Sequence, residues 1–321
     1  MADDRLFVLR APPYALDPEL QRILDKQSKI RFILENELTA TSRALVKGLF
    51  IYGPYKYVSN SLLDDLPSLK VISSIGAGFD RIDIPAATKR GIRVGNTPGV
   101  VQDCTADMAI GLLLASARHI VTGDANTRKP GFTKESIFNC FGTRVTGSTL
   151  GIVGLGAVGF AVAMRAKGFK MRILYHGRTR REGKECETGA EYCSKLDELL
   201  KESDFVVLCC ALTKETRHLI TAAQLSQMKS SATLINVARG GIVNHDDLTT
   251  ALQNGVIRGA ALDVTEPEPL PHGHPLLALP NVIVTPHIGT LTLATRSAMM
   301  EMGIENLLAG LGSKPLPYPL N

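Results

Sequence analysis

Tryptophan is absent from this chain, and aromatic residues make up only 5% of its 321 residues. The net charge is +5, but lysine and arginine are scattered along the sequence. Nucleic-acid-binding proteins usually concentrate their positive charge in a patch that is interleaved with aromatic side chains. The composition therefore argues against a nucleic-acid partner, while the surplus of cations suits anionic small molecules.

The sequence also lacks a long hydrophobic run near its beginning. The most apolar stretch there, "RLFVLRAPPY", is short and interrupted by prolines, which is typical of neither a signal peptide nor a membrane span. The chain ends "PYPLN", so it does not end in a peroxisomal signal of the "SKL" kind. We expect a protein of the cytoplasm that has no membrane partner.

The cysteines show no spacing that is typical of a metal site. They are Cys104, Cys140, Cys186, Cys193, Cys209 and Cys210. Because the last two lie inside an apolar run, we expect free thiols in a reducing compartment. His272 and His274 in "PHGHP" have no further metal ligand nearby, so we expect a solvated loop and no metal.

Short β-rich runs alternate with helical patterns along the whole chain. The runs are "RLFVL", "LFIY", "KVISSIG", "GIRVGN", "TLGIVG", "MRILY", "DFVVLCCAL", "ATLINVA", "GAALDV" and "NVIVTPH". Several of them are apolar without alternation, as parallel strands buried on both faces should be. The pattern predicts the α/β class with doubly wound parallel sheets.

The runs fall into two groups, which predicts two domains. The first four end near Asn96, and a turn with a long apolar helix follows. The strongest strand–turn–helix signal begins only at Leu150. The last helix, "LATRSAMMEMGIENLLAG", has no strand of its own after it and can pack back on the first domain.

A glycine-rich turn follows the run "TLGIVG" and opens an Ala/Val-rich helix. Gly154, Gly156 and Gly159 form the pattern G-x-G-x-x-G in the strand–turn–helix context that a dinucleotide site requires. The first glycine permits a tight turn, the second lets backbone N–H groups approach a diphosphate, and the third lets helix and strand pack closely. The upstream "IGAGFDRID" has Arg81 at the third position, so we do not interpret it as a second site.

The acidic residue that should hold the adenosine ribose, about 20 residues after the first glycine, is missing. The stretch "YHGRTRR" instead offers His176, then Arg178, Thr179 and Arg180. Arginines bind phosphate oxygens in a fork, and a threonine hydroxyl can add a donor. The cofactor predicted is therefore NADP(H), with NAD(H) as the second choice. The alternative is a solvated loop that is basic by chance.

Three later strands each end at polar residues, and ligands of open α/β sheets bind beyond such ends. Arg239 follows the first strand, Glu266 and Glu268 follow the second, and His287 follows the third. Hydride reduction of a 2-keto acid needs a cation for the carboxylate and a proton donor for the developing alkoxide. Arg239 suits the first task and His287 the second. Glu268 is the favoured partner of the histidine over Glu266, although Arg239 and His287 could each be structural.

The motifs "GLGAVG", "NVARGGIVN", "LDVTEPEPLP" and "TPHIG" together resemble the D-isomer-specific 2-hydroxyacid dehydrogenases, in particular the glyoxylate/hydroxypyruvate reductase branch. The resemblance extends from about Lys70 to Leu311. It implies a discontinuous flavodoxin-like substrate-binding domain, residues 1–100 and 291–321, and a Rossmann-like NAD(P)-binding domain, residues 101–290. It also implies a homodimer built around the long helix after Pro98.

The resemblance further implies the site residues. The catalytic set falls on Arg239, Glu268 and His287, and the substrate carboxylate falls on the loop "GAGFD", where the N–H groups of Ala77 and Gly78 would bind it. The cofactor set comprises Gly154, Leu155, Gly156, Ala157, Val158, Gly159, His176, Arg178, Thr179, Arg180, Ala211, Val237, Asp263 and Gly289. Asp263 matches a position near the nicotinamide amide.

One departure concerns the substrate. Members of this branch often have tryptophans in the segment before the phosphate loop, where this chain has "GFTKESIFNCFG". Reaction class is thus better defined than substrate, which we expect to be glyoxylate or hydroxypyruvate, reduced to the D-2-hydroxy acid. The alternative is an NAD(P)-sensing binding protein or co-repressor on the same fold, without significant turnover.

Overall fold

The computed structural model describes residues 5–11, 15–53, 56–133 and 141–321. The chain forms two compact units. Unit 1 consists of Met1–Val101 and Leu291–Asn321, and unit 2 consists of Gln102–Thr290. The division after Val101 lies one residue from the boundary predicted after residue 100.

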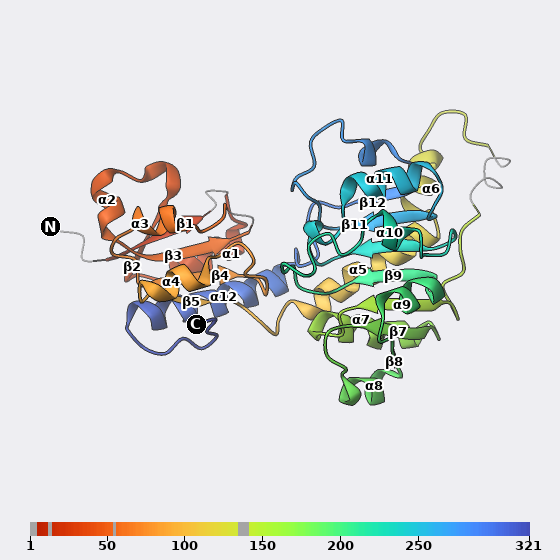
Figure 1. Cartoon of the computed structure of the whole chain (residues 1–321). Coiled ribbons are helices and arrows are strands. Elements are labelled where there is room, and N and C mark those ends of the chain that lie inside the picture. The colour runs from red at the N-terminus through yellow and green to blue at the C-terminus, as the bar shows by residue number, and fades with distance from the viewer. Residues whose placement is uncertain (1–4, 12–14, 54–55, 134–140) are drawn as a thin grey trace. The chain divides into compact units, whose positions relative to one another are not determined.

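Unit 1 is built on a parallel sheet, drawn in red to orange in Figure 1. Its strands are β1 (Leu6–Ala11), β2 (Ile30–Leu34), β3 (Val46–Tyr52), β4 (Val71–Ile75) and β5 (Arg93–Gly95). They lie in the order β2-β1-β3-β4-β5, which is the flavodoxin-like order that the resemblance implies. The strand β2 was not among the predicted runs; it is an edge strand in which only Ile30 and Ile33 are buried.

Helices cover both faces of this sheet. They are α1 (Pro18–Asp25), α2 (Ala40–Leu45), α3 (Asn60–Asp64), α4 (Ile84–Lys89) and α12 (Leu293–Leu311), with a 3₁₀ turn at Glu35–Glu37. The helix α12, blue in Figure 1, packs on β4, as the sequence indicated. Its small residues allow a close approach, since a Cβ atom at Gly310 would lie 2.4 Å from Val71. The hydroxyl of Ser73 donates a hydrogen bond to the carbonyl of Gly303 across the same contact, 2.7 Å long.

Unit 2 is built on a larger parallel sheet. Its strands are β6 (Thr149–Val153), β7 (Arg172–His176), β8 (Glu191–Tyr192), β9 (Phe205–Leu208), β10 (Thr233–Asn236), β11 (Gly259–Leu262) and β12 (Val282–Val284). Their order, β12-β11-β10-β9-β6-β7-β8, is that of a Rossmann fold with one more strand at one edge. The strand order reverses between β6 and β9, and ligands of such sheets bind at this point, beyond the carboxyl ends of the strands.

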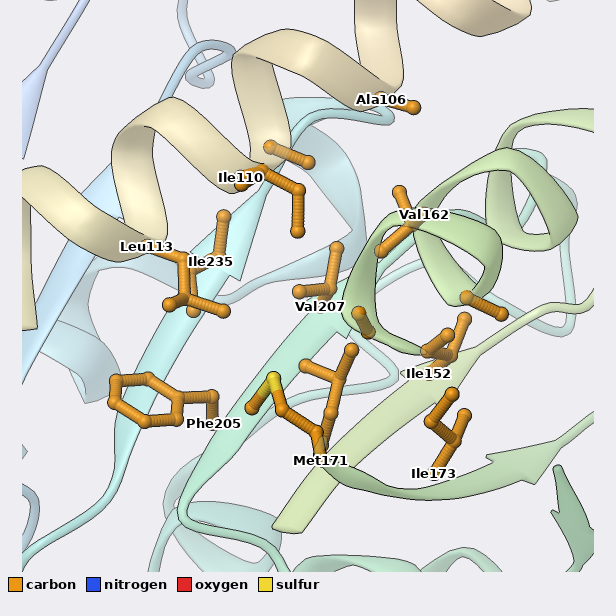
Figure 2. Packing of buried hydrophobic residues seen from close by; sticks show 14 of the residues in the cluster. Ala106, Ile110, Leu113, Ile152, Val162, Met171, Ile173, Phe205, Val207 and Ile235 are labelled. Carbon is orange, nitrogen blue, oxygen red and sulfur yellow. The ribbon is translucent and has the colours of Figure 1, made fainter. Parts of the chain in front are cut away.

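Two layers of helices enclose the sheet of unit 2. They are α5 (Gln102–Ala117), α6 (Ile120–Thr127), α7 (Ala157–Gly168), α8 (Glu182–Thr188), α9 (Leu196–Glu202), α10 (Ala222–Leu225) and α11 (His245–Gln253), with 3₁₀ turns at Gly240–Ile242 and Pro275–Ala278. Figure 2 shows the core between the sheet and α5 and α7, where Ile152 and Val207 meet Leu113 and Val162. The next residue along β6, Val153, packs into the core on the opposite face. This alternation explains why the strands read as continuous apolar runs.

The long apolar helix predicted after Pro98 ends earlier than its pattern suggests. The helix α5 stops at Ala117, and His119 adopts a left-handed conformation with φ 51° before α6 begins. Among the described residues, no single helix is long and apolar enough to cross a membrane. The helices α5 and α6 are bent by 59° relative to each other, and only the two combined reach that length and apolar composition.

Candidate active site

The phosphate loop begins where β6 ends, at the point where the strand order reverses. Gly154 has a φ of +98°, a conformation that side chains with a Cβ atom rarely adopt. A Cβ atom there would also lie 2.9 Å from the Cα atom of Cys210, just after β9. The N–H of Gly154 donates to the carbonyl of His176, 2.8 Å away, which ties the turn to the end of β7. Only glycine meets both conditions at this position.

The two other glycines have opposite surroundings. A Cβ atom at Gly159 would lie 2.1 Å from the carbonyl oxygen of Gly154, so this glycine lets α7 pack against the turn. A Cβ atom at Gly156, the N-cap of α7, would meet no atom of the described residues within 4 Å apart from its neighbours along the chain. The space beside Gly156 is thus open, at the positive end of a helix whose first N–H groups are unpaired by the helix itself. These residues fit a diphosphate.

At the end of β7, the ring of His176 is held by the next strand. Its Nδ1 atom donates to the carbonyl of Cys193, 2.9 Å away, which leaves Nε2 for a ligand. Arg178 is exposed, and its charge acts on the groups that follow β9. Burial raises the pKa of the Cys210 thiol to about 11, and Arg178 opposes that shift. Arg178 thus follows β7 as an exposed side chain, and its contact with a cofactor stays a prediction.

Arg180 has a partner that the sequence did not reveal. Its Nε and Nη2 atoms each lie 2.9 Å from a carboxylate oxygen of Glu185 on α8. Glu185 also accepts a 2.5 Å hydrogen bond from the hydroxyl of Tyr175. The hydrogen bonds from Arg180 and Tyr175 lower the pKa of Glu185, while burial, with the help of Glu185, raises that of Tyr175 to about 12. One edge of the Arg180 guanidinium is thus occupied, and its contact with a cofactor stays a prediction.

Arg239 follows β10 in a turn that a buried asparagine shapes. The side chain of Asn236 is fully buried; it accepts from the N–H of Ala238 at 3.0 Å and donates to the carbonyl of Arg239 at 2.8 Å. The Nη1 atom of Arg239 donates to the carbonyl of Ala238, 2.8 Å away. The arginine is half-buried at the carboxyl end of the sheet. Asn236 lies in a motif quoted above, but its role needed the fold to be seen.

The two competing glutamates have separate partners. Both carboxylate oxygens of Glu266 lie 3.0 Å from Nη1 of Arg217, and one of them is 3.5 Å from Nε2 of His218. Glu268 instead accepts a 2.5 Å hydrogen bond from Nδ1 of His287. The structure therefore places Glu268, not Glu266, against the histidine.

The pair of Glu268 and His287 is organised for proton transfer. The Glu268 side chain is 15% exposed, whereas that of His287 is 40% exposed, so the imidazole is open to a substrate and the carboxylate is sheltered. Since Nδ1 bonds to Glu268, Nε2 is the atom that can face a substrate. His287 has a φ of 56°, an uncommon conformation for a non-glycine residue and one that clusters at functional sites.

Asp263 holds the turn that carries His287. Asp263 is only 2% exposed. Its carboxylate accepts three hydrogen bonds: from the hydroxyl of Thr285 at 2.6 Å, from the N–H of Ile288 at 2.9 Å and from the N–H of Gly289 at 2.8 Å. Three donors explain how a carboxylate can be buried here without a cation. Asp263 thus fixes the unusual backbone of His287, a function that no motif indicated. Its contact with a nicotinamide stays a prediction.

The remaining site residues lie at other strand ends. Ala211 follows β9, and its carbonyl accepts from the hydroxyl of Thr216 at 2.7 Å. Val237 follows β10 and is buried. Within the ranges that the structure covers, no group of three His, Cys, Asp or Glu side chains could hold a metal ion. Most of the segment "GFTKESIFNCFG" lies outside the described residues.

The predicted carboxylate loop belongs to unit 1. Gly76 has a φ of +129°, and its N–H donates to the hydroxyl of Thr97 at 2.8 Å. The side chain of Asn96 donates to the carbonyl of Ala77, also at 2.8 Å. The Ala77 carbonyl is thus bound by Asn96, while the N–H of Gly76 is already paired with Thr97 and is not available to an anion. Joint action of Ala77 and Gly78 with the histidine of unit 2 stays a prediction.

Comparisons with known proteins agree with this geometry. Residues 110–289 match the family model described as D-isomer specific 2-hydroxyacid dehydrogenase, NAD binding domain. A glyoxylate reductase of Pyrococcus horikoshii is 47% identical over 256 residues, which cover 78% of this chain and 76% of the relative.

Solved structures are similar over almost the whole chain. One is the NADPH-dependent glyoxylate/hydroxypyruvate reductase of Sinorhizobium meliloti in complex with NADP and malonate, with a TM-score of 0.87, 34% identity and 98% and 97% coverage of the two chains. Another is the D-lactate dehydrogenase of Aquifex aeolicus with NAD and lactic acid, with a TM-score of 0.85, 29% identity and 96% coverage of each chain. With its Rossmann order, its phosphate loop and its Glu268–His287 pair, this chain belongs to the D-isomer specific 2-hydroxyacid dehydrogenase family.

Proposed function

We propose that this protein reduces glyoxylate or hydroxypyruvate to the D-2-hydroxy acid, with NADPH as the preferred reductant. The observation that carries the proposal is the Glu268–His287 pair, which presents an imidazole beyond the carboxyl end of a Rossmann sheet. The glyoxylate reductases among the relatives, and the NADPH-dependent reductase of Sinorhizobium meliloti, support the substrate and the cofactor.

Each part of the reaction falls to a particular group. A bound reduced nicotinamide supplies the hydride. Arg239 binds the carboxylate of the keto acid and fixes its orientation. His287 donates a proton from Nε2 to the carbonyl oxygen, where negative charge develops. Glu268 accepts a hydrogen bond from Nδ1 and so fixes the orientation of the ring.

A panel of substrates tests this function. Steady-state rates with glyoxylate, hydroxypyruvate, pyruvate and 2-ketogluconate, each with NADPH and with NADH, identify the preferred keto acid. We expect the highest kcat/KM for glyoxylate or hydroxypyruvate. A purely cofactor-sensing protein would need no proton donor, and binding of NADPH without turnover of any of the four acids would favour that alternative.

We expect wild-type protein to prefer NADPH over NADH by at least tenfold in kcat/KM, or about 1.4 kcal/mol. We expect Arg178→Ala to lower kcat/KM for NADPH far more than kcat/KM for NADH. Only NADPH carries the 2′-phosphate, and the exposed guanidinium of Arg178 lies beyond the end of β7, where the ribose is expected. The measurement is kcat/KM with each cofactor for both proteins. Equal losses with NADPH and NADH would show that Arg178 does not bind the 2′-phosphate.

We further propose a homodimer in the cytoplasm. Apolar side chains are exposed on α6 and in the segment after it: Ile120 is 56% exposed, Val121 53% and Phe141 83%. Such an apolar surface is typical of a protein contact. The free thiols Cys209 and Cys210 suit a reducing compartment. Sedimentation velocity of the whole chain tests the dimer, and a single monomeric species at micromolar concentration would contradict it.

A further inference from the structure

Lys184, on α8, binds the backbone carbonyls of the phosphate loop. Its Nζ atom donates to the carbonyl of Gly156 at 2.9 Å and to that of Leu155 at 3.2 Å. The ammonium also lies 5.3 Å from the ring centroid of Phe160 on α7. No motif marks this lysine, which lies beyond the basic stretch that ends at Arg181.

These two hydrogen bonds fix the direction of two backbone N–H groups. In a trans peptide the C=O and the N–H point in opposite directions. A donor that holds the carbonyls of Leu155 and Gly156 therefore turns the N–H groups of Gly156 and Ala157 to the other side of the loop. A cation on the carbonyl also polarises the peptide and strengthens its N–H as a donor.

Without a bound anion, the Lys184 ammonium lies where other positive groups repel it. The positive end of the α7 dipole begins at Gly156, whose carbonyl the lysine binds. Burial and the nearby Arg181 lower the pKa of Lys184, and Glu187 opposes this shift. An anion bound at the loop would offset the repulsion among these positive groups.

We propose that Lys184 is a cofactor-positioning residue, which orients the Gly156 and Ala157 N–H groups toward the diphosphate shared by NADPH and NADH. The proposal rests on the proposed use of a nicotinamide dinucleotide. It differs from the role given to Arg178, because a diphosphate contact affects both cofactors equally, whereas a contact with the 2′-phosphate affects NADPH alone.

Isothermal titration calorimetry of the whole protein with NADPH and with NADH, without keto acid, tests the proposal. Lys184→Met retains an unbranched stem beside Phe160 but removes the charge and the donors. We expect the Kd of both cofactors to rise about tenfold, with their ratio unchanged, because hydrogen bonds from charged groups are lost. Lys184→Arg keeps a cationic donor and is expected to restore both Kd values to within about threefold of wild type.

Lys167→Met is the matched control. Nζ of Lys167 donates to the carbonyl of Glu187 at 2.6 Å, so it also joins α7 to α8, but at the far end of α7. Equal losses of affinity in the two methionine variants would show that helix packing, not the loop, is responsible and would overturn the proposal. An unchanged Kd in Lys184→Met, or a loss confined to NADPH, would overturn it too. If wild-type protein binds neither dinucleotide, the proposed function itself fails.

Discussion

His287→Ala is expected to lower kcat for keto-acid reduction by roughly 10²–10⁴-fold, the usual contribution of a general acid, while NADPH still binds. In the proposed reaction, the imidazole protonates the alkoxide as the hydride arrives. Alanine removes both the proton donor at Nε2 and the Nδ1 atom that binds Glu268. Single-turnover rates and a calorimetric Kd for NADPH separate the chemical step from cofactor binding.

His218→Ala is a closely matched control. His218 also has a left-handed backbone, with φ 50°, and a glutamate partner, since its Nε2 lies 3.5 Å from Glu266. The two histidine side chains are 43% and 40% exposed. We expect His218→Ala to keep kcat within about threefold of wild type. A similar result for His287→Ala would mean that the proton comes from another group.

Glu268→Gln tests the orientation of the same ring. A glutamine can still accept from Nδ1, but it replaces the carboxylate with a neutral and weaker acceptor. We expect kcat for reduction to fall about tenfold, less than in His287→Ala. Glu266→Gln should keep kcat within about threefold of wild type, because Glu266 is bound to Arg217. If both variants keep the wild-type kcat, Glu268 does not position His287.

Features that depend on neighbours in the sequence could be predicted. The phosphate loop is defined by glycines within one turn. Asn244 begins α11 for an equally local reason, because its side chain can cap the N–H groups that follow it. In the structure it accepts from the N–H groups of Asp246 and Asp247. Strands buried on both faces were found from their unbroken apolar runs, as β6 shows. In these cases the sequence carries the physical cause locally.

Features that depend on distant contacts could not be predicted. Lys184 and Glu185 reach their partners only because α8 packs beside α7 and β7. The carboxylate of Asp263 is buried by three donors that lie more than twenty positions later. The strand β8 is only two residues long and is defined by its pairing with β7 rather than by its own pattern. Helix packing and strand pairing supply these constraints.

The three loop glycines differ in what limits them, which allows folding and ligand binding to be separated. Gly159→Ala would press its Cβ atom against the Gly154 carbonyl at 2.1 Å, so we expect a loss of stability as well as of function. A Cβ atom at Gly168, the last residue of α7, would meet no described side chain or distant backbone atom within 4 Å. As a control, Gly168→Ala should leave both cofactor binding and folding intact, with a stability gain of up to about 1 kcal/mol.

Gly156→Ala is expected to fold normally and to lose most of its affinity for NADPH and NADH. In the part of the chain that the structure describes, a Cβ atom there meets no atom within 4 Å beyond its chain neighbours. Alanine in place of glycine at an N-cap changes the unfolding free energy by no more than about 1 kcal/mol. The methyl group would occupy the space through which a diphosphate approaches the α7 N-terminus, and such a clash typically costs about 1–3 kcal/mol, or roughly tenfold to hundredfold in Kd. Calorimetric titration with each cofactor, together with the melting temperature of the cofactor-free protein, measures both effects. Unchanged affinity at unchanged stability would place the diphosphate elsewhere, because the space that the methyl group enters is open among the described residues.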